Sequence, residues 1–385
     1  MHQAERAVFD LRRGLSVVIR DEDTRTLIQP VETLDAPRLA ELQQLAGTPP
    51  RLALTLTRHR LASIGRVIAD EAASLDLSAT LDCSALIRLA LQRGERIDDT
   101  LPLRQASPSE LAATRLLRRA QVVPAALSLR LGEQARANID AAVASGELLA
   151  VNLSDIQALC ASAPGRLIRI SEARVPLAGA EDCRFVLFRE ASGLHEHVAI
   201  LIGERDRWQD IVPMRLHSAC LTGDIFGSQR CDCGEQLRRG IAAIHQQGGG
   251  VLLYLAQEGR GIGLGNKFRA YRLQDQGLDT IDADQVIGFS KDERDFRIAQ
   301  QMLEALDIHR VTLLTNNPAK IESLRQAGID VVNRQPIYGD ITQYNQRYLN
   351  TKADRHGHWL HELLNEQDEP IRPEALLHPA VDHQD

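Results

Sequence analysis

The chain has 385 residues, of which 44% are hydrophobic and 25% are charged, so its length and composition predict two or three domains with full apolar cores. The formal net charge of -7 argues against a nucleic-acid-binding protein, because such domains are usually strongly basic. No apolar run approaches the roughly 20 residues of a membrane span, and the N-terminus lacks the apolar core of a secretory signal. We therefore expect a cytoplasmic protein, in which clustered cysteines usually bind metals or act in catalysis.

Residues 1–165 alternate short apolar runs with amphipathic patterns, which predicts an α/β domain. Strands are expected at 15–19 and 52–56, and helices at 37–47 and 109–120, where apolar residues recur three and four positions apart. The segment 160–170 contains a Pro-Gly pair and is typical of a linker into a second domain.

The second half continues the α/β pattern. Strands are expected at 197–204, 251–257 and 310–315, and a helix at 292–308 shows one apolar face at helical spacing. Ser290 and Glu293 have the spacing of a capping box before this helix. Residues 363–385 are polar, acidic and contain prolines, so we expect a disordered tail.

Three of the six cysteines gather at 220–233, with a Thr-Gly-Asp turn after the first of them: Cys220, Cys231 and Cys233. Zinc prefers thiolate ligands, and three thiolates leave one position of a tetrahedral ion open, as in catalytic sites. The spacing alone leaves two interpretations, a catalytic site that activates water or a structural knuckle completed by His217 or a distant histidine. The other cysteines are scattered and are expected to be ordinary buried or partly buried thiols. They are Cys83, Cys160 and Cys183.

Two further stretches suit an anionic ligand. In "EGRGIGLGNK", alternating glycines lead from a strand into a helix and let the backbone approach a ligand closely. The stretch matches neither a Walker loop nor GxGxxG, and a glycine-rich connection with a solvated basic face is the alternative. In "TNNPAK", Lys320 stands in the first helical turn, where a cation is unfavourable unless an anion binds there. A solvated lysine is the alternative. Arg294 is also expected in a first helical turn, where its positive charge is equally unfavourable.

Together and in this order, these stretches resemble GTP cyclohydrolase II. The resemblance runs from about residue 168 to 361 and is carried by "RLHSACLTGDIFGSQRCDCGEQL", "EGRGIGLGNKFRAYRLQDQGLDT", "DERDF", "LLTNNPAKIE" and "YLNTKADRHGH". It implies a catalytic domain at 168–362 that opens the imidazole ring of GTP and releases formate and diphosphate. The product would be 2,5-diamino-6-(5-phosphoribosylamino)pyrimidin-4(3H)-one, formed in the first step of riboflavin biosynthesis.

The resemblance also implies roles for single residues and for cofactors. One zinc ion per subunit is expected on Cys220, Cys231 and Cys233, and its open position would hold the attacking water. Asp292 matches the proposed proton acceptor, Arg294 the proposed nucleophile at the α-phosphorus, and Tyr271 the catalytic tyrosine. Magnesium is expected on the triphosphate, and the protein is expected to be a homodimer. The expected GTP contacts are Arg215, Leu216, His217, Ser218, Ala219, Gln236, Glu258, Gly259, Arg260, Thr280, Thr315 and Lys320.

One position departs from the family pattern. Ala219 stands where the family often has a glutamate before the first cysteine. A backbone contact to the triphosphate or magnesium would survive this change, but a side-chain contact would not. The carboxylate of Glu258 is suited to read the guanine edge, because it accepts hydrogen bonds from N–H donors.

Residues 1–165 resemble 3,4-dihydroxy-2-butanone 4-phosphate synthase at "AVFDLRRGLSVVIRDED" and "LALTLTRHRLASIG". The acidic "ENEGD" loop that binds the metal and the sugar phosphate in that family does not follow "RDED", where the chain reads "TRTLIQPVE". The "RxGHTEA" segment is missing too. We predict a degenerate, inactive synthase-like domain that serves dimerisation, stability or regulation; an unrelated α/β domain with its own ligand is the alternative.

Three other functions compete with the complete reaction. One is a relative that opens the purine ring and keeps the formyl group, against which Tyr271 argues. Another is a regulatory GTP-binding module without catalysis, against which the intact set of expected catalytic residues argues. A zinc-knuckle nucleic-acid binder is disfavoured by the acidic charge and by the aromatic content of 4%, because single strands are bound largely by stacking on aromatic rings.

Overall fold

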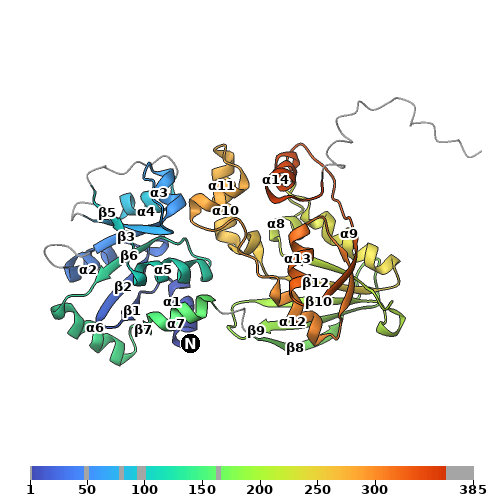
Figure 1. The fold of residues 1–385 in the computed structure, drawn as a ribbon, viewed down its shortest axis with the longest axis horizontal. Helices are drawn as coiled ribbons and strands as arrows, with labels where there is room; N and C mark the ends of the chain where they lie inside the picture. The colour runs from blue at the N-terminus through green and yellow to red at the C-terminus, as the bar shows by residue number, and fades with distance from the viewer. Residues whose placement is uncertain (1, 47–51, 78–81, 93–100, 162–165, 361–385) are drawn as a thin grey trace, which may run out of the picture.

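The computed structural model describes residues 2–46, 52–77, 82–92, 101–161 and 166–360. These residues form two units that lie side by side, each built around one mixed sheet (Figure 1). The expected α/β class with two units is therefore confirmed. The centre of the expected linker, at 162–165, and the expected tail at 363–385 lie outside the described residues. None of the described helices is long and apolar enough to cross a membrane.

The first unit contains a seven-stranded sheet, as far as its residues are described, in the order β5-β4-β3-β6-β2-β1-β7. Its strands are β1 (Val17–Asp21), β2 (Thr24–Pro30), β3 (Leu52–Thr57), β4 (Ala72–Asp76), β5 (Leu103–Gln105), β6 (Ala126–Arg130) and β7 (Leu149–Asn152). Its helical segments are α1 (His2–Arg12), η1 (Val31–Thr33), α2 (Ala36–Ala46), α3 (Arg58–Ser63), α4 (Cys83–Leu91), α5 (Pro108–Arg119), α6 (Glu133–Ser145) and α7 (Leu153–Ala161).

Successive residues of β1 point to opposite faces of this sheet and join different cores. Val17 and Ile19 pack with α1, α5 and α7 on one face. Val18 packs on the other face with apolar residues of α2 and α4. Both faces are covered, which explains the continuous apolar run that predicted this strand.

A tight turn joins β1 to β2. Asp21 pairs with Thr24 in the antiparallel register, so that Glu22 and Asp23 form a two-residue connection. Glu22 adopts the left-handed region, with φ of 46°. The residues that follow "RDED" therefore enter β2 directly, without an intervening loop.

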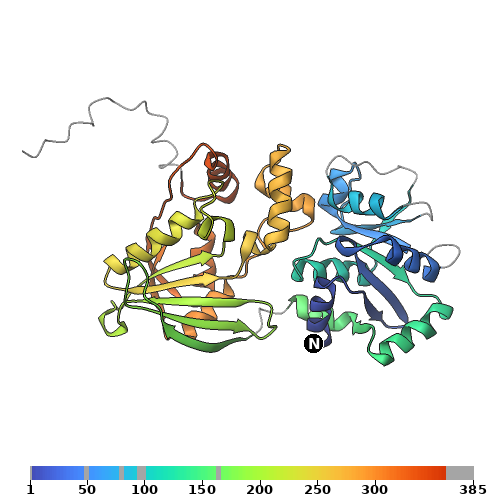
Figure 2. The ribbon, with the colours of Figure 1, turned by 180° about the vertical axis from the view of Figure 1, so that it is seen from behind.

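The second unit contains a sheet of the same size within the described residues, in the order β14-β13-β11-β12-β10-β9-β8. Its strands are β8 (Leu167–Arg174), β9 (Cys183–Glu190), β10 (Glu196–Ile202), β11 (Val212–Ser218), β12 (Gly250–Leu255), β13 (Arg310–Leu314) and β14 (Asp330–Gln335). Its helical segments are η2 (Arg205–Arg207), α8 (Leu221–Asp224), α9 (Cys233–Gln246), η3 (Glu258–Gly261), α10 (Leu264–Asp275), α11 (Thr280–Ile287), α12 (Arg297–Ala305), α13 (Pro318–Gln326) and α14 (Gln346–His356). Figure 2 shows this sheet from behind.

The strands and helices expected in the sequence are found, with one correction. The expected helix at 292–308 begins only at Arg297. Asp292 accepts a hydrogen bond from the Arg294 amide, and Asp295 accepts one from the Arg297 amide. Such local side-chain bonds compete with a helix and form turns instead. Arg294 therefore lies in a turn before the helix, and the prediction that placed it in the first helical turn is wrong.

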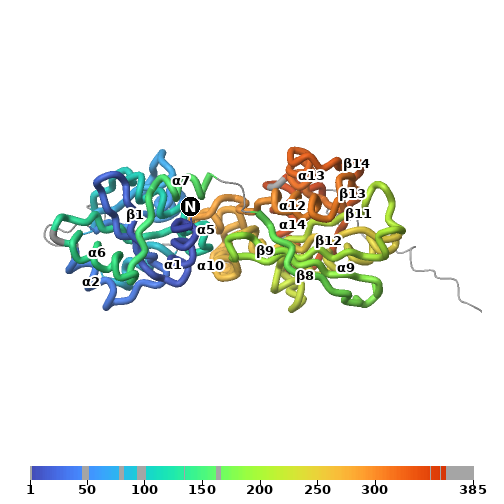
Figure 3. The backbone as a smooth tube through the Cα atoms, turned by 90° about the horizontal axis from the view of Figure 1, so that it is seen from below, coloured from blue at the N-terminus to red at the C-terminus, as the bar shows by residue number. Residues whose placement is uncertain are grey.

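Helices α10 and α11 leave the second unit and pack on the first. Ala270 and Leu273 of α10, and Ala283 and Ile287 of α11, are buried in the same apolar cluster as Leu54 of β3. Figures 1 and 3 show this pair of helices between the two sheets. The two units are therefore joined by a continuous apolar core as well as by the chain itself.

Candidate active site

The candidate site forms where three neighbouring parallel strands end. Strand β11 pairs in parallel with β12 on one side and with β13 on the other. Ser218 ends β11 just before the cysteines, Leu255 ends β12 just before the glycine-rich turn, and Leu314 ends β13 just before α13. The carboxyl edge of parallel strands is the usual ligand position in such sheets. The three sequence stretches that suggested chemistry thus meet at one edge.

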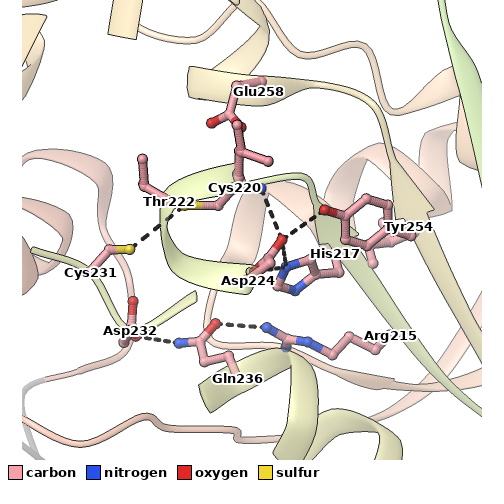
Figure 4. A network of polar contacts seen from close by, with 12 residues as sticks. Arg215, His217, Cys220, Thr222, Asp224, Cys231, Asp232, Gln236, Tyr254 and Glu258 are labelled. Atoms are coloured by element: carbon pink, nitrogen blue, oxygen red, sulfur yellow. Dashed lines mark hydrogen bonds and ion pairs between the residues drawn. The ribbon is translucent and has the colours of Figure 1, made fainter. Parts of the chain in front are cut away.

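The three expected metal ligands come together there. The sulfur atoms of Cys220, Cys231 and Cys233 all lie within 4.8 Å of one another, and those of Cys220 and Cys231 are 3.7 Å apart (Figure 4). Zinc–sulfur bonds of about 2.3 Å at tetrahedral angles place sulfur atoms about 3.8 Å apart. Gly223 lies against them, and a Cβ atom there would stand 2.8 Å from the Cys231 sulfur. The thiols therefore fit one zinc ion.

His217 does not join the thiols. Its Nε2 atom lies 3.0 Å from the carboxylate of Asp224, and its ring stacks on Tyr254 at 5.5 Å between centroids. Asp224 also accepts hydrogen bonds from the Tyr254 hydroxyl and from the Cys220 amide (Figure 4). Burial lowers the pKa of His217. Within the described chain, the metal-binding group contains cysteines alone, which leaves the knuckle completed by His217 without support.

Lys267 contacts this group, although the sequence analysis assigned it no specific role. The residue is only 8% exposed, and its Nζ atom lies 3.2 Å from the Cys220 sulfur and 2.8 Å from the Glu258 carboxylate. The pKa of Cys220 is lowered by hydrogen bonds with the other two thiols and by the Lys267 ammonium. Hydrogen bonding to Cys220 raises the pKa of Cys231 to about 11. Lys267 therefore supplies a buried positive charge beside the first cysteine.

Both oxygen atoms of Glu258 are engaged within the protein. One accepts from the Leu221 amide at 2.6 Å, and the other from Lys267 and from the Gly259 amide. Glu258 thus ties the glycine-rich turn to the cysteine segment. The expected role of this carboxylate in reading the guanine edge stays a prediction.

A second group of residues carries positive charge. Arg215 is buried and donates to Gln236 and to the Leu314 carbonyl, while its Nε atom has no hydrogen-bond partner among the described residues. Burial lowers the pKa of Arg215 to about 10. Lys320 donates to the Leu216 carbonyl at 2.8 Å. Burial, together with the nearby Arg294 and Arg215, lowers the pKa of Lys320. Partly or fully buried cations that repel one another favour an anionic ligand, since an anion would offset the electrostatic cost.

Asp292 and Arg294 form a bidentate pair. The Nε and Nη2 atoms of Arg294 lie 2.9 Å and 2.6 Å from the two carboxylate oxygens. Burial alone would raise the pKa of Asp292, but the guanidinium and its hydrogen bonds lower it. The guanidinium also lies over the Phe296 ring, and the Lys320 ammonium lies over the same ring. The pair is therefore held in a fixed orientation beside the buried cations.

Two adjoining cavities contain most of the expected residues. The thiol cavity is lined, among the expected residues, by Ser218, Ala219, Cys220, Cys231, Cys233, Glu258, Gly259, Arg260, Tyr271, Thr280 and Arg294. The cationic cavity is lined, among the expected residues, by Arg215, His217, Ser218, Cys233, Gln236, Arg260, Arg294 and Lys320. The four residues that appear in both lists join the two cavities. Leu216, Thr315 and Asp292 line neither, and they contact the site only through neighbouring residues.

Sequence reasoning missed several further residues of these cavities. Tyr348 of α14 lines both, and Lys352, one helical turn later, lines the cationic cavity and lies 2.9 Å from the buried Asp232. Their spacing in "YLNTKADRHGH" places them on one face of a helix, which was the available signal. Asp284 of α11 lines the thiol cavity 3.4 Å from Arg260, and burial raises its pKa to about 7.

The remaining cysteines lie away from the site as buried or partly buried free thiols, as expected. They are Cys83, Cys160 and Cys183. The glycine-rich connection does not carry a solvated basic face, because Lys267 is buried. Lys320 is not a solvated lysine either, because its ammonium group is bonded to a backbone carbonyl at the cavity.

Comparison with known proteins agrees with this geometry. The model of the family GTP cyclohydrolase II matches residues 168–336. A GTP cyclohydrolase-2 from Azospirillum brasilense is 40% identical over 363 residues, which cover 93% of this chain and 94% of the relative. A GTP cyclohydrolase-2 from Xylella fastidiosa (strain 9a5c) is 39% identical over 359 residues, which cover 92% and 87%.

A shorter relative matches the second unit alone. A GTP cyclohydrolase-2 from Neisseria meningitidis serogroup A is 51% identical over 175 residues, which cover 46% of this chain and 88% of the relative. A solved structure of a two-domain 3,4-dihydroxy-2-butanone 4-phosphate synthase from A. baumannii aligns with 88% of this chain at a TM-score of 0.33 and 14% identity, too weakly to inform the first unit. The long relatives include both units, and this chain belongs to the GTP cyclohydrolase II family of enzymes.

Proposed function

We propose that this chain catalyses the zinc-dependent hydrolysis of GTP to 2,5-diamino-6-(5-phosphoribosylamino)pyrimidin-4(3H)-one, formate and diphosphate. The observation that carries the proposal is the joining of the thiol cavity to the cationic cavity at Cys233 and Arg294. One nucleotide would place its base near the thiols and its phosphates among the buried cations. A ligand that carries only an anionic group, without a base, would occupy the cationic cavity alone.

The cationic cavity would hold the phosphates. Arg215, Lys320 and Lys352 line this cavity together. A bound anion would stabilise the charged form of Lys320, whose pKa is lowered by burial and by the neighbouring cations. Positive groups fixed in advance stabilise charge that develops on phosphate oxygens during reaction. Arg294 lies at the junction of the two cavities, a position that suits the expected contact with the α-phosphorus. Magnesium would accompany the triphosphate, held mainly by phosphate oxygens, since Ala219 offers no carboxylate.

The thiol cavity would hold the base. Zinc bound by Cys220, Cys231 and Cys233 would keep one position open and activate water for hydrolysis at neutral pH. Tyr271 lines this cavity between Lys267 and Arg230, whose cationic groups lie 5.7 Å and 5.0 Å from its ring centroid. Tyr271 would orient the ring, and Asp292, ionised beside Arg294, would accept the proton.

The test is incubation of the zinc-loaded protein with GTP and magnesium, with formate and the pyrimidine product followed by mass and absorbance. Release of both in equal amounts supports the proposal. Retention of the formyl group would indicate a ring-opening relative, and tight GTP binding without turnover would indicate a regulatory module. The variant Tyr271→Phe is the matched probe, because it keeps the ring and removes only the hydroxyl.

For the first unit, we propose a synthase-like domain that has lost its own reaction. The course of the chain after "RDED" supports this, because Thr24–Pro30 form strand β2 at once and leave no acidic loop there. Purified protein is expected to form no dihydroxybutanone phosphate from ribulose 5-phosphate with magnesium. Detection of that product would contradict the proposal. A homodimer is expected, and the mass in solution decides between it and a monomer.

A further inference from the structure

A residue of the first unit fastens the turn that carries Arg260 into the candidate site. Gln121 follows α5, and its Nε2 atom donates to the Gly261 carbonyl at 3.1 Å. Its backbone carbonyl accepts a hydrogen bond from Asn266 of α10 at 2.8 Å. One residue outside the second unit thus binds both the glycine-rich turn and the helix that follows it.

The fastened turn has a strained backbone. Arg260 has φ of 62°, and its neighbours Gly259 and Gly261 have φ of 62° and 92°. A left-handed conformation costs a residue such as arginine about 1–2 kcal/mol, and it persists only where the surroundings hold it. Gly263 touches Gln121 so closely that a Cβ atom there would stand 3.0 Å from its side-chain oxygen. Hydrogen bonds within the second unit hold this turn, and Gln121 adds a contact from the first unit.

A second set of polar contacts holds the same place. Arg269 of α10 pairs with Glu32 of the first unit at 2.8 Å and donates to the Asn266 side chain at 2.7 Å. The other oxygen of Glu32 accepts from the Val123 amide, two residues after Gln121. The contacts close a ring of polar groups across the two units around Asn266, which is 1% exposed. Such a closed network fixes the position of each member.

The far end of the α10–α11 pair is fastened as well. The Nε atom of Arg118 donates to the Gly288 carbonyl at 3.0 Å. A Cβ atom at Gly288 would stand 2.6 Å from Pro124 of the first unit. Apolar side chains of both helices are buried in the core of that unit.

The segment held in this way carries a large part of the thiol cavity. Lys267 and Tyr271 stand on α10, and Thr280 and Asp284 stand on α11. The Arg260 carbonyl also accepts from the Glu293 amide at 3.0 Å, which links the turn to the segment of Asp292 and Arg294. A shift of the turn would therefore reach the groups expected to act on the substrate.

We propose that the first unit completes the active site and that Gln121 is its main positioning residue, which acts through the turn of Arg260. The proposal rests on the proposed function and gives the first unit a role in it. The contacts of Gln121 reach the backbone of the turn and the start of α10, so its effect on the cavities is exerted through that backbone. It holds Arg260 where the two cavities join.

The test uses the full-length, zinc-loaded protein with Gln121→Gly. Gln121 itself has φ of 57°, so glycine removes the side chain without adding strain to the backbone. Glu22→Gly is the matched control, because Glu22 is also left-handed but lies in the β1–β2 turn of the first unit. We expect Gln121→Gly to keep its zinc and to lose roughly 10- to 100-fold in kcat/KM for GTP, as small misplacements do. The control is expected to match the wild type.

Two readouts separate positioning from general damage. In an Arg260→Ala background, Gln121→Gly is expected to cost less than about threefold, because coupled residues are not additive. If Gln121→Gly lowers kcat/KM equally in the wild-type and Arg260→Ala backgrounds, Gln121 does not act through Arg260. Hydrogen exchange of the Gly261 and Gly263 amides should be roughly 2- to 10-fold faster in Gln121→Gly, the range that one lost hydrogen bond allows.

The exchange measurement needs no substrate. If the wild type fails to hydrolyse GTP, the proposed function is wrong. Faster exchange of the turn in Gln121→Gly would still support the role of Gln121 in holding the turn of Arg260. The amides of 215–220 serve as internal reference. Unchanged exchange of the turn would contradict the positioning role of Gln121 even in a protein that hydrolyses GTP.

Discussion

The two units have sheets of the same size, but their strands run in different directions. In the first sheet, the described pairs from β5 to β1 are all antiparallel, and only β7 joins β1 in parallel. In the second sheet, four neighbours, β12, β11, β13 and β14, are parallel. Carboxyl ends of parallel strands meet at one edge, and those of antiparallel strands alternate between two edges. The second sheet can therefore gather polar residues from three separate stretches, and the first cannot.

The same contrast appears in the buried charged groups. In the second unit, Arg215 is buried and Lys320 is half-buried, and both have lowered pKa values, which costs stability and suits a ligand. In the first unit, the buried Glu110 is paired with Arg104 through two bonds of 2.7 Å and accepts a third hydrogen bond from Ser128. Its charge is satisfied within the fold. We expect substitutions of these cations in the second unit to change activity, and that of Glu110 in the first to change stability.

The largest expected effect is on Cys231→Ser. Loss of one thiolate from the three should remove tight zinc binding, and GTP hydrolysis should fall by about 1,000-fold or more, since the activated water is lost with the ion. Zinc content by mass spectrometry and formate release measure the two effects. Cys83→Ser, in a partly buried thiol of the first unit, is the control and should keep both. Full activity of Cys231→Ser would remove the zinc from the proposed reaction.

Lys320→Ala should have the next largest effect. Removal of one preplaced cation is expected to lower kcat/KM for GTP by about 100-fold, as the removal of a single electrostatic contact does in other enzymes. Zinc content should not change, because Lys320 lies in the cationic cavity and not among the thiols. Lys291→Ala is the matched control, since Lys291 is an exposed lysine in the nearby segment. Equal rates for the two variants would show that the phosphates bind elsewhere.

The sequence was sufficient for the strands and for the residues that follow them directly. Cys220, Glu258 and Lys320 each stand within a few residues of a strand end, so that a linear motif carries its own position. Contacts between distant stretches were not predictable in this way. The sequence shows that Lys267 is basic, but its burial against Cys220 depends on where α10 lies.

The sequence could not predict where α10 packs, for a physical reason. Ala270 and Leu273 show that one face is apolar, but an apolar face does not specify which surface will cover it. The contact of Gln121 with Gly261 spans 140 positions and leaves no local pattern. The start of α12 was misplaced because Ser290 and Glu293 have the spacing of a capping box, whereas Asp292 and Asp295 form turns that delay the helix to Arg297.

Glu110→Gln tests the first unit and should change stability without changing activity. Burial would raise the pKa of Glu110, but hydrogen bonds from Arg104, Ser128 and the Ser107 amide lower it to about 2. A lowered pKa contributes stability above the unfolded value of about 4.5, and the contribution is lost as the pH falls towards 2. We expect the variant to lose about 2–3 kcal/mol at pH 7 and less at pH 3. Thermal melts measure this, with exposed Glu133→Gln as control; an equal loss at both pH values would contradict the charge-based explanation.

Asp284→Asn should give the smallest effect, and with the opposite sign. Burial raises the pKa of Asp284 to about 7, although Arg260 lies 3.4 Å away. The folded state therefore binds a proton between the unfolded value of 3.8 and pH 7, so the free energy of unfolding falls as the pH rises through this window. Asparagine cannot ionise, and the variant without GTP should gain roughly 1–3 kcal/mol at pH 8 and almost nothing at pH 4. A gain confined to high pH would show that the second unit maintains a buried carboxylate at a cost to its stability, as binding sites do, whereas a loss at pH 8 would show that the ion pair with Arg260 outweighs burial.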